Sequence, residues 1–231
     1  MTDQDTIDAN ADKFDRLAKF SGMPLETANT HLLMKFLPSK GTEKAMAAVL
    51  KFVGVDQAGK PLRQHSFITL AGEPGRGKTH LALGIGWHWI GSHSKPVKYW
   101  QAERLLAAAR REFDSPRKDD YGQPLPSVLE TAERVPLLIL DDLGAEKTTE
   151  WAEAKLDELI DYRYINRLPT VFTTNLAPAQ LTGRIASRLK EGVTVTLEGP
   201  DYREVLARAR DAGAAEPKVL KDNDKKRGGT L

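Results

Sequence analysis

The chain has 231 residues, of which 40% are hydrophobic and 29% charged, with no cysteine and a formal net charge of +2. These values are typical of a globular protein and exclude a fully disordered, collagenous or coiled-coil chain. No run of eighteen apolar residues is present, so we expect no transmembrane helix and no membrane partner. The acidic amino terminus lacks a hydrophobic signal core, which favours a cytoplasmic location. Because the net charge is small, a nucleic-acid contact would require a local basic patch.

The first sixty residues are polar and predict helices. Apolar residues at helical spacing predict one helix over Ala11–Phe20, which Gly22 and Pro24 should end. A second apolar stripe predicts a helix over Thr42–Val53, with the threonine as a possible cap.

Short apolar runs alternate with helical patterns from residue 66 onwards. This alternation predicts an α/β fold, with a five-stranded parallel sheet between helices. We divide the chain into a helical segment and lead-in (1–60), a core (61–211) and a disordered basic tail (212–231). The expected strands are Ser66–Ala71, Val97–Trp100, Pro136–Asp141, Thr170–Thr174 and Val193–Leu197, and the expected helices are Lys78–Ile90, Ala102–Phe113, Pro126–Glu133, Glu150–Arg167 and Pro178–Leu189.

A glycine-rich segment, GEPGRGKT, lies between the first expected strand and the helix after it. It matches the GxxxxGK[ST] pattern, whose curled backbone points N–H groups at phosphate oxygens. Lys78 would place its charge on the β- and γ-phosphates, and Thr79 would offer a hydroxyl to Mg²⁺. The alternative is a glycine-rich turn that caps a helix. The candidate nucleotide-binding residues are Gly72, Glu73, Pro74, Gly75, Arg76, Gly77, Lys78, Thr79 and His80.

Two adjacent carboxylates follow the apolar run that precedes residue 141. Adjacent strand residues point to opposite sides, so the two acids should have different roles. Asp141 suits Mg²⁺ coordination together with Thr79, whereas Asp142 would face the γ-phosphate and polarise an attacking water. In isolation, such a pair also fits a turn or a helix cap.

Polar residues follow the next buried strand. Asn175 can both donate and accept hydrogen bonds, so it could hold the attacking water, although an Asx turn would also explain it. Arg184 and Arg188 lie four residues apart and share one helix face. A guanidinium there could reach a phosphate in the same or a neighbouring subunit, and the alternative is a solvated basic face.

A local basic cluster surrounds the helix expected after the second strand. Nearby aromatic residues could stack on the bases of single-stranded DNA, whereas a solvated face over an ordinary core is the competing interpretation. The cluster comprises Arg104, Arg110, Arg111, Arg117 and Lys118.

These segments together resemble the AAA+ ATPases, within them the replicative helicase loaders of the DnaC and DnaI type, and also the related IstB-type transposition ATPases. The resemblance extends over roughly residues 20 to 205. The matching text is GEPGRGKTHLA, LLILDDLGAEKTTEW, DYRY before LPTVFTTNL, and RIASRL followed by GPDYR. The resemblance implies an AAA+ core that binds ATP and Mg²⁺, and therefore an ATPase.

The resemblance also implies roles for individual residues. It makes Asp141 and Asp142 the Walker B acids, Asn175 the sensor-1 residue, and Arg188 an arginine finger that acts across a head-to-tail interface. Arg203 resembles a terminal arginine motif. The sequence departs from the family in having a second aspartate instead of glutamate. Only one short helix fits after the last strand, so we expect a reduced or absent lid.

The resemblance leaves two functions open. The first is an ATP-driven loader that acts on a replicative helicase and single-stranded DNA during DNA replication. The second is an IstB-like, ATP-dependent DNA-binding adaptor that directs a transposase. A phosphotransferase is disfavoured because it would need a dedicated acceptor pocket.

Overall fold

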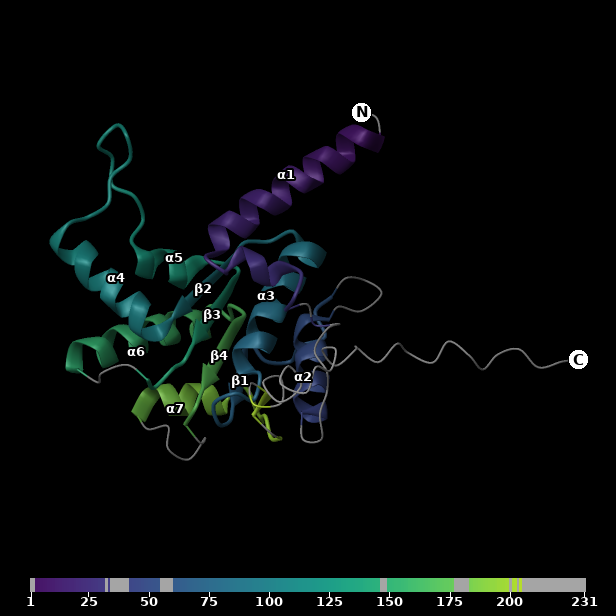
Figure 1. The fold of residues 1–231 in the computed structure, drawn as a ribbon. Helices are drawn as coiled ribbons and strands as arrows, with labels where there is room; N and C mark the ends of the chain where they lie inside the picture. Colours follow the sequence, from purple (N-terminus) through teal and green to yellow (C-terminus); the bar gives the residue numbers. More distant parts are fainter. Residues whose placement is uncertain are drawn as a thin grey trace, which may run out of the picture.

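A five-stranded, all-parallel sheet forms the centre of the molecule (Figure 1). The computed structural model describes residues 3–31, 33, 42–54, 60–145, 149–176, 183–199, 201–202 and 204. The strands run in the order β2-β3-β4-β1-β5, and every neighbouring pair is parallel. Their bounds are β1 Phe67–Ala71, β2 Val97–Gln101, β3 Leu137–Asp141, β4 Thr170–Thr174 and β5 Val193–Thr196. The predicted strands are therefore confirmed, with ends that differ by one residue at most.

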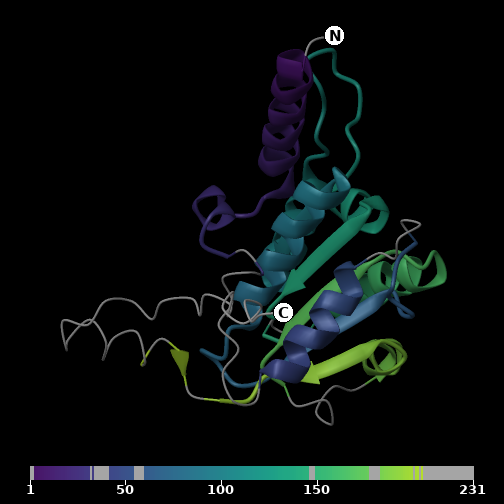
Figure 2. The same ribbon diagram turned by 90° about the vertical axis from the view of Figure 1, so that its right-hand side faces the viewer.

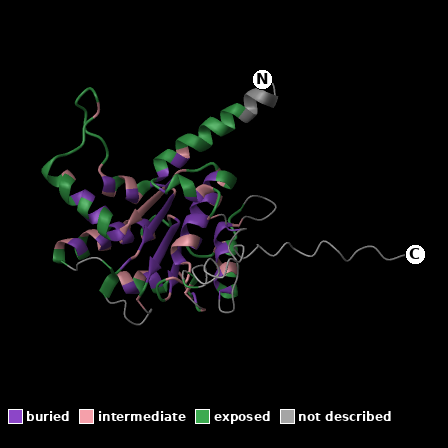
Figure 3. Ribbon diagram, in the orientation of Figure 1, coloured by how far each residue is buried: buried purple, intermediate pink, exposed green. Residues whose placement is uncertain are grey.

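The burial of each strand follows its position in the sheet. β1, β3 and β4 are buried along their whole length (Figure 3), as expected for apolar runs covered on both faces. The edge strand β5 alternates instead, with Val193 and Val195 half-buried and the threonines exposed. β4 lies between β3 and β1, so the carboxyl ends of these three parallel strands lie side by side at one end of the sheet.

Helices cover both faces of the sheet, as the α/β prediction requires (Figure 2). One apolar cluster joins α1, α2 and α3 to alternate residues of the central strands, and a second cluster joins α4, α5, α6 and α7 to the opposite face. The helices are α1 Asp3–Ser21, α2 Glu43–Val53, α3 Lys78–His93, α4 Ala102–Asp114, α5 Val128–Arg134, α6 Glu150–Ile165 and α7 Gly183–Lys190.

The first helix, α1, is longer than predicted and extends away from the body of the molecule (Figure 1). Its described side chains before residue 14 are exposed. The apolar pattern therefore marks only the part of α1 that packs against the core. In that part Ala18 is buried, and Phe14 stacks on Trp87 with ring centroids 6.3 Å apart. The helix ends before Gly22, whose φ of 74° is favourable for glycine.

The amino-terminal segment is also tied to the core by a hydrogen bond. The short 3-10 helix η1, Leu25–Ala28, follows α1. The indole Nε1 of Trp87 on α3 donates to the Thr27 hydroxyl at 2.9 Å. This bond satisfies a buried polar group and fixes the lead-in beside α3.

Local capping sets two helix boundaries that the sequence analysis misplaced. α5 begins at Val128 rather than Pro126, because Ser127 and Glu130 form a capping box at its amino terminus. α6 ends at Ile165, two residues before the predicted end, and Arg167 adopts a φ of 51°. This left-handed conformation turns the chain into β4.

A fully buried arginine connects α6 to the end of α5 and the beginning of β4. Arg163 is 0% exposed and donates to the carbonyls of Ala132, Glu133, Val135 and Pro169 at 2.6 to 2.9 Å, and to the Thr170 hydroxyl at 2.8 Å. Burial lowers the pKa of Arg163 to about 9. The side chain satisfies carbonyls at the carboxyl end of α5, so it caps that helix from a distance.

Several expectations concern residues outside the described ranges. They are the first part of the helix predicted from Pro178, most of the short helix expected after the last strand (Tyr202–Ala209), Arg203 and the tail from residue 212. The division into three segments stays a prediction. Among the described residues, no helix is both long enough and apolar enough to span a bilayer.

Candidate nucleotide-binding site

The glycine-rich segment forms a tight loop between β1 and α3. Gly72, Gly75 and Gly77 have φ values of 143°, 77° and 86°, which favour glycine. A Cβ on Gly72 would lie 2.6 Å from the carbonyl oxygen of Leu197, so this position also lacks room for a side chain. α3 begins at Lys78, and its positive amino-terminal end therefore faces the loop.

The lysine of the loop is buried and folds back across it. Lys78 is 6% exposed, and its Nζ donates to the carbonyl oxygens of Gly72 and Glu73 at 2.8 Å each. Arg76 forms an ion pair with Glu73 at 2.5 Å at the outer side of the loop. The ammonium thus lies within the curl of the backbone, where the motif predicts the phosphates.

The carboxylate of Asp141 accepts three hydroxyl hydrogen bonds. Thr79 lies 3.0 and 3.2 Å from its two oxygens, Thr173 lies 2.6 Å from Oδ1, and Tyr99 lies 2.8 Å from Oδ2. Burial, together with the nearby carboxylate, raises the pKa of Tyr99. The predicted pair of Mg²⁺ ligands, Thr79 and Asp141, is therefore in direct contact although 62 residues separate them in sequence.

Asp142 and Asn175 line one cavity beside the phosphate loop. The cavity has a volume of about 520 Å³, which is in the usual range for small-molecule sites. Asp142 lies beyond the end of β3 with a φ of 56°, so the alternation expected for a strand does not set its direction. The cavity is lined by His31, Pro74, Gly75, Gly77, Lys78, Thr79, His80, Asp142, Asn175 and Tyr202.

The sequence analysis missed four residues of this site. His31 stacks on His80 with ring centroids 4.3 Å apart, and burial lowers the pKa of His80 to about 4. The backbone N–H of Tyr202 donates to the Gly75 carbonyl at 3.0 Å. Tertiary packing alone brings His31 and Tyr202 to the site, and it does the same for Tyr99 and Thr173. The sequence pattern marked only polar residues near the ends of the expected strands.

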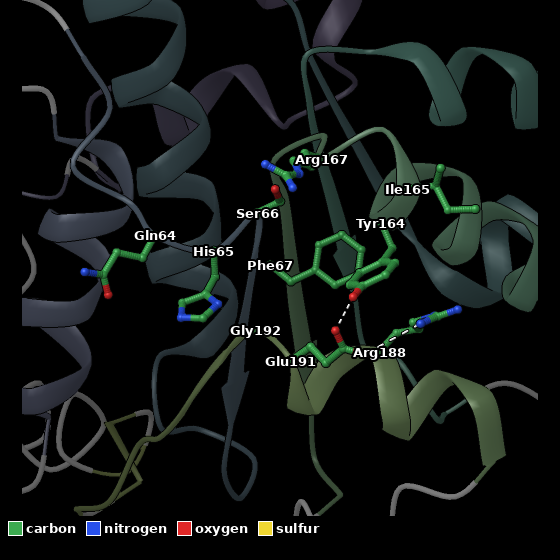
Figure 4. Close-up of a pocket in the computed structure, with 10 residues that line it drawn as sticks. All are labelled: Gln64, His65, Ser66, Phe67, Tyr164, Ile165, Arg167, Arg188, Glu191 and Gly192. Atoms are coloured by element: carbon green, nitrogen blue, oxygen red, sulfur yellow. Dashed lines mark hydrogen bonds and ion pairs between the residues drawn. The ribbon is translucent and has the colours of Figure 1, made fainter.

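Arg188 lies beside Tyr164 and Glu191 (Figure 4) and is not among the residues that line the nucleotide cavity. Its Nε donates to Asp161 at 2.6 Å, and its guanidinium lies 4.4 Å from the ring centroid of Tyr164 and 3.5 Å from Glu191. Arg184 lies 3.8 Å from the same aspartate. Arg188 lines a second cavity of about 460 Å³, together with Gln64, His65, Ser66, Phe67, Tyr164, Ile165, Arg167, Glu191 and Gly192.

This second cavity lies at the amino-terminal ends of the strands, whereas the phosphate loop lies at their carboxyl ends. Its lining includes Ser66, Arg167 and Gly192, which precede β1, β4 and β5, whereas the phosphate loop follows β1. Because the strands are parallel, the two cavities face opposite ends of the molecule. Arg188 could therefore complete a nucleotide site only in a neighbouring copy.

The five residues of the basic cluster are all exposed, on α4 and on the loop that projects after it (Figure 1). Arg117 pairs with Glu112 and donates to the Pro126 carbonyl at 2.6 Å, and Arg110 lies over the Trp151 ring at 5.4 Å. Asp119 accepts two backbone N–H groups of the loop, at 2.8 and 2.9 Å. Two exposed aromatic side chains accompany the basic residues, namely Phe113 (86% exposed) and Tyr121 (90% exposed).

The sheet order, the phosphate loop at the end of β1 and the acids at the end of β3 define a P-loop ATPase fold of the AAA+ class. A family model described as IstB-like ATP binding protein matches residues 56–185. The chain therefore belongs to the IstB-like family of ATP-binding proteins.

Individual relatives agree with this fold. The chain is 26% identical over 140 residues to the chromosomal replication initiator protein DnaA of Onion yellows phytoplasma, a match that covers 58% of this chain. The chain spans only 26% of the length of this relative, and 35% of the length of a second one, the uncharacterized protein YqaM of Bacillus subtilis.

Two solved structures are similar at low sequence identity. The DnaC helicase loader is 23% identical, with a TM-score of 0.57, and the alignment covers 74% of this chain and 98% of that chain. A DnaA bound to AMPPCP and single-stranded DNA is 17% identical, with a TM-score of 0.63 and coverage of 83% and 58%. These likenesses establish the shared fold.

Proposed function

We propose that the chain binds ATP with Mg²⁺ and hydrolyses it slowly, as a switch. The contact between Thr79 and Asp141, beside a loop that curls around Lys78, is the observation that carries this proposal. These residues fit ATP with Mg²⁺. A hydroxyl and a carboxylate are hard oxygen ligands suited to Mg²⁺, and the loop offers backbone N–H groups to the phosphates.

Each residue has a distinct part in this reaction. Lys78 holds the phosphates by charge, and Thr79 with Asp141 holds the metal, which supplies charge neutralisation on the phosphate oxygens when bound. Asp142 polarises the attacking water from the cavity wall. Asn175, on the same wall, keeps that water in line through its amide group. Glu73, Pro74, Arg76 and His80 complete the loop around the nucleotide.

The arginine finger is proposed to act between subunits. Arg188 lies at the end of the sheet opposite to its own phosphate loop. In a head-to-tail assembly it would therefore enter the nucleotide site of the neighbouring subunit. Such heterologous interfaces generate rings or open spirals. Nucleotide binding and hydrolysis would then change the assembly and its affinity for partners.

Arg188→Ala should leave ATP affinity unchanged and reduce turnover to the rate of isolated subunits. The guanidinium is tied to Asp161 within its own chain and does not contribute to that chain's nucleotide site. ATPase assays across a range of protein concentrations measure the effect. Mixing Arg188→Ala with Asp142→Asn should restore activity, because one subunit supplies the finger and the other an intact site. If the mixture stays as inactive as its components, the finger does not act in trans.

The wider role proposed is that of a helicase loader in DNA replication. The match to helicase-loader and DnaA folds supports an ATP-driven role in replication, whereas membership of the IstB-like family keeps a transposase adaptor as the second candidate. Pull-down of a cognate replicative helicase and of a transposase, each with and without ATP, separates the two. ATP-dependent capture of the helicase supports the loader, and capture of the transposase alone contradicts it.

Single-stranded DNA is proposed to bind the basic cluster on α4 and its loop. Arg111→Glu combined with Lys118→Glu should weaken DNA binding at least about tenfold and reduce its salt dependence, because phosphate contacts release counterions. Fluorescence anisotropy with labelled oligonucleotides at several salt concentrations measures both quantities. Lys155→Glu, on α6, is the control. Affinity that survives the double change would place DNA elsewhere.

A further inference from the structure

One threonine hydroxyl contacts both acidic residues at the end of β3. Thr173 on β4 is 0% exposed, and its Oγ1 donates to Asp141 Oδ1 at 2.6 Å. The same oxygen accepts the backbone N–H of Asp142 at 2.9 Å. A single buried group therefore links the side chain of one acid to the backbone of the next.

This link lies where the regular sheet stops. The register of β3 with β4 ends at Leu140 opposite Phe172. Beyond it, the Leu143 N–H donates to the Thr173 carbonyl at 2.8 Å, and the Thr174 hydroxyl donates to the Leu143 carbonyl at 2.7 Å. Asp142, between these contacts, has a φ of 56°, a left-handed conformation that is uncommon for residues with a side chain.

We propose that Thr173 is a positioning residue that fixes the direction of both acids in the nucleotide site. This inference rests on the proposed function, in which Asp141 holds the metal and Asp142 the attacking water. The Thr173 hydroxyl fixes one oxygen of Asp141 and, through the Asp142 amide, the turn that directs the second carboxylate into the cavity. Tyr99 holds the other oxygen of Asp141 at 2.8 Å and assists only the first acid.

Valine at position 173 keeps the shape of threonine but loses both hydrogen bonds. Asp141 would then retain only the Thr79 and Tyr99 hydroxyls of its three hydroxyl contacts, so its carboxylate would be oriented less firmly. The Asp142 amide would lose its acceptor, so the left-handed turn would be held less firmly. Loss of such outer contacts typically weakens metal binding by about 10- to 100-fold.

The test compares Thr173→Val with Thr173→Ser, which keeps the hydroxyl. Thr69→Val on β1 is the matched control, because the buried Thr69 hydroxyl has no hydrogen-bond partner among the described residues. Mn²⁺ binding in the presence of ADP, followed by electron paramagnetic resonance, reports metal affinity without turnover. ATPase assays separate kcat from KM. Thermal unfolding of each nucleotide-free variant establishes that it is folded.

Thr173→Val is expected to weaken Mn²⁺ binding at least about tenfold and to lower kcat, while metal-free nucleotide affinity changes less than twofold. Thr173→Ser and Thr69→Val should resemble the unmodified chain. If Thr173→Val does not fold, Thr173→Ala keeps the inference testable, because it removes the same hydroxyl and should also weaken Mn²⁺ binding and lower kcat.

Three results would overturn the inference. Metal affinity and kcat equal to those of Thr69→Val would make Thr173 purely structural. Failure of Thr173→Ser to keep the metal affinity and kcat of the unmodified chain would show that the hydroxyl alone does not set them. For the fallback variant, unchanged Mn²⁺ binding and kcat in Thr173→Ala would have the same meaning. Absence of nucleotide and metal binding in the unmodified chain would instead overturn the proposed function, and this inference with it.

Discussion

Lys78→Ala is expected to reduce ATP affinity by about 10- to 100-fold and to abolish hydrolysis. The lysine is buried within the phosphate loop and bonded to two carbonyls of that loop, so its charge lies where the phosphates would bind. Losing a buried charged hydrogen-bond donor costs roughly 1.5–3 kcal/mol, and a lost transition-state contact adds to this. Titration of a fluorescent ATP analogue and phosphate-release assays measure the two effects.

Lys155→Ala is the matched control for this change. Lys155 forms an ion pair with Glu158 on α6, and neither residue lines the nucleotide cavity. Such surface pairs contribute at most about 1 kcal/mol, so binding and turnover should be unchanged. Parent-like affinity and rate in Lys78→Ala would contradict the assignment of the loop.

The largest effect on stability is expected for Arg163→Met. The substitution keeps much of the aliphatic volume but removes donors to four carbonyls and one hydroxyl, all at 2.6 to 2.9 Å. Each buried acceptor left unsatisfied costs about 1–3 kcal/mol, so we expect a loss of about 3 kcal/mol or more after relaxation. For a chain of this size, that corresponds to a decrease in Tm of roughly 10 °C. Calorimetry or denaturant unfolding measures it.

Arg134→Met serves as the control for Arg163→Met. Arg134 lies in the last turn of α5 and is exposed, so the same chemical change should alter stability by no more than about 0.5 kcal/mol. Equal stability losses in the two variants would show that the buried hydrogen bonds of Arg163 contribute nothing specific.

Local patterns were sufficient to predict most of the fold. The apolar runs of the five strands and the GEPGRGKT segment are short, contiguous signals, and the structure has them as expected. The beginning of α5 was missed because a capping box overrides apolar periodicity. The beginning of α1 was missed because the residues before Ala11 are mostly polar and give only a weak apolar pattern.

The candidate site was only partly predictable for a physical reason. Lys78, Thr79 and Asp141 belong to motifs whose chemistry requires those residue types, whereas Thr173 and Tyr99 contribute a hydroxyl that many other positions could offer. Their importance depends on the sheet order, which brings β4 and β2 beside β3. Arg163 was also missed, because charged side chains are usually exposed and no sequence pattern marks one that is 0% exposed.

Calorimetric titration of the unmodified chain with ATP, in the presence and absence of Mg²⁺, tests the central claim most directly. The account predicts one saturable site per chain, with affinity that increases when Mg²⁺ is present and that Lys78→Ala removes. Absence of binding heat with Mg²⁺ present, confirmed by a fluorescent analogue that also fails to bind, would contradict the claim that this loop and these acids hold a nucleotide.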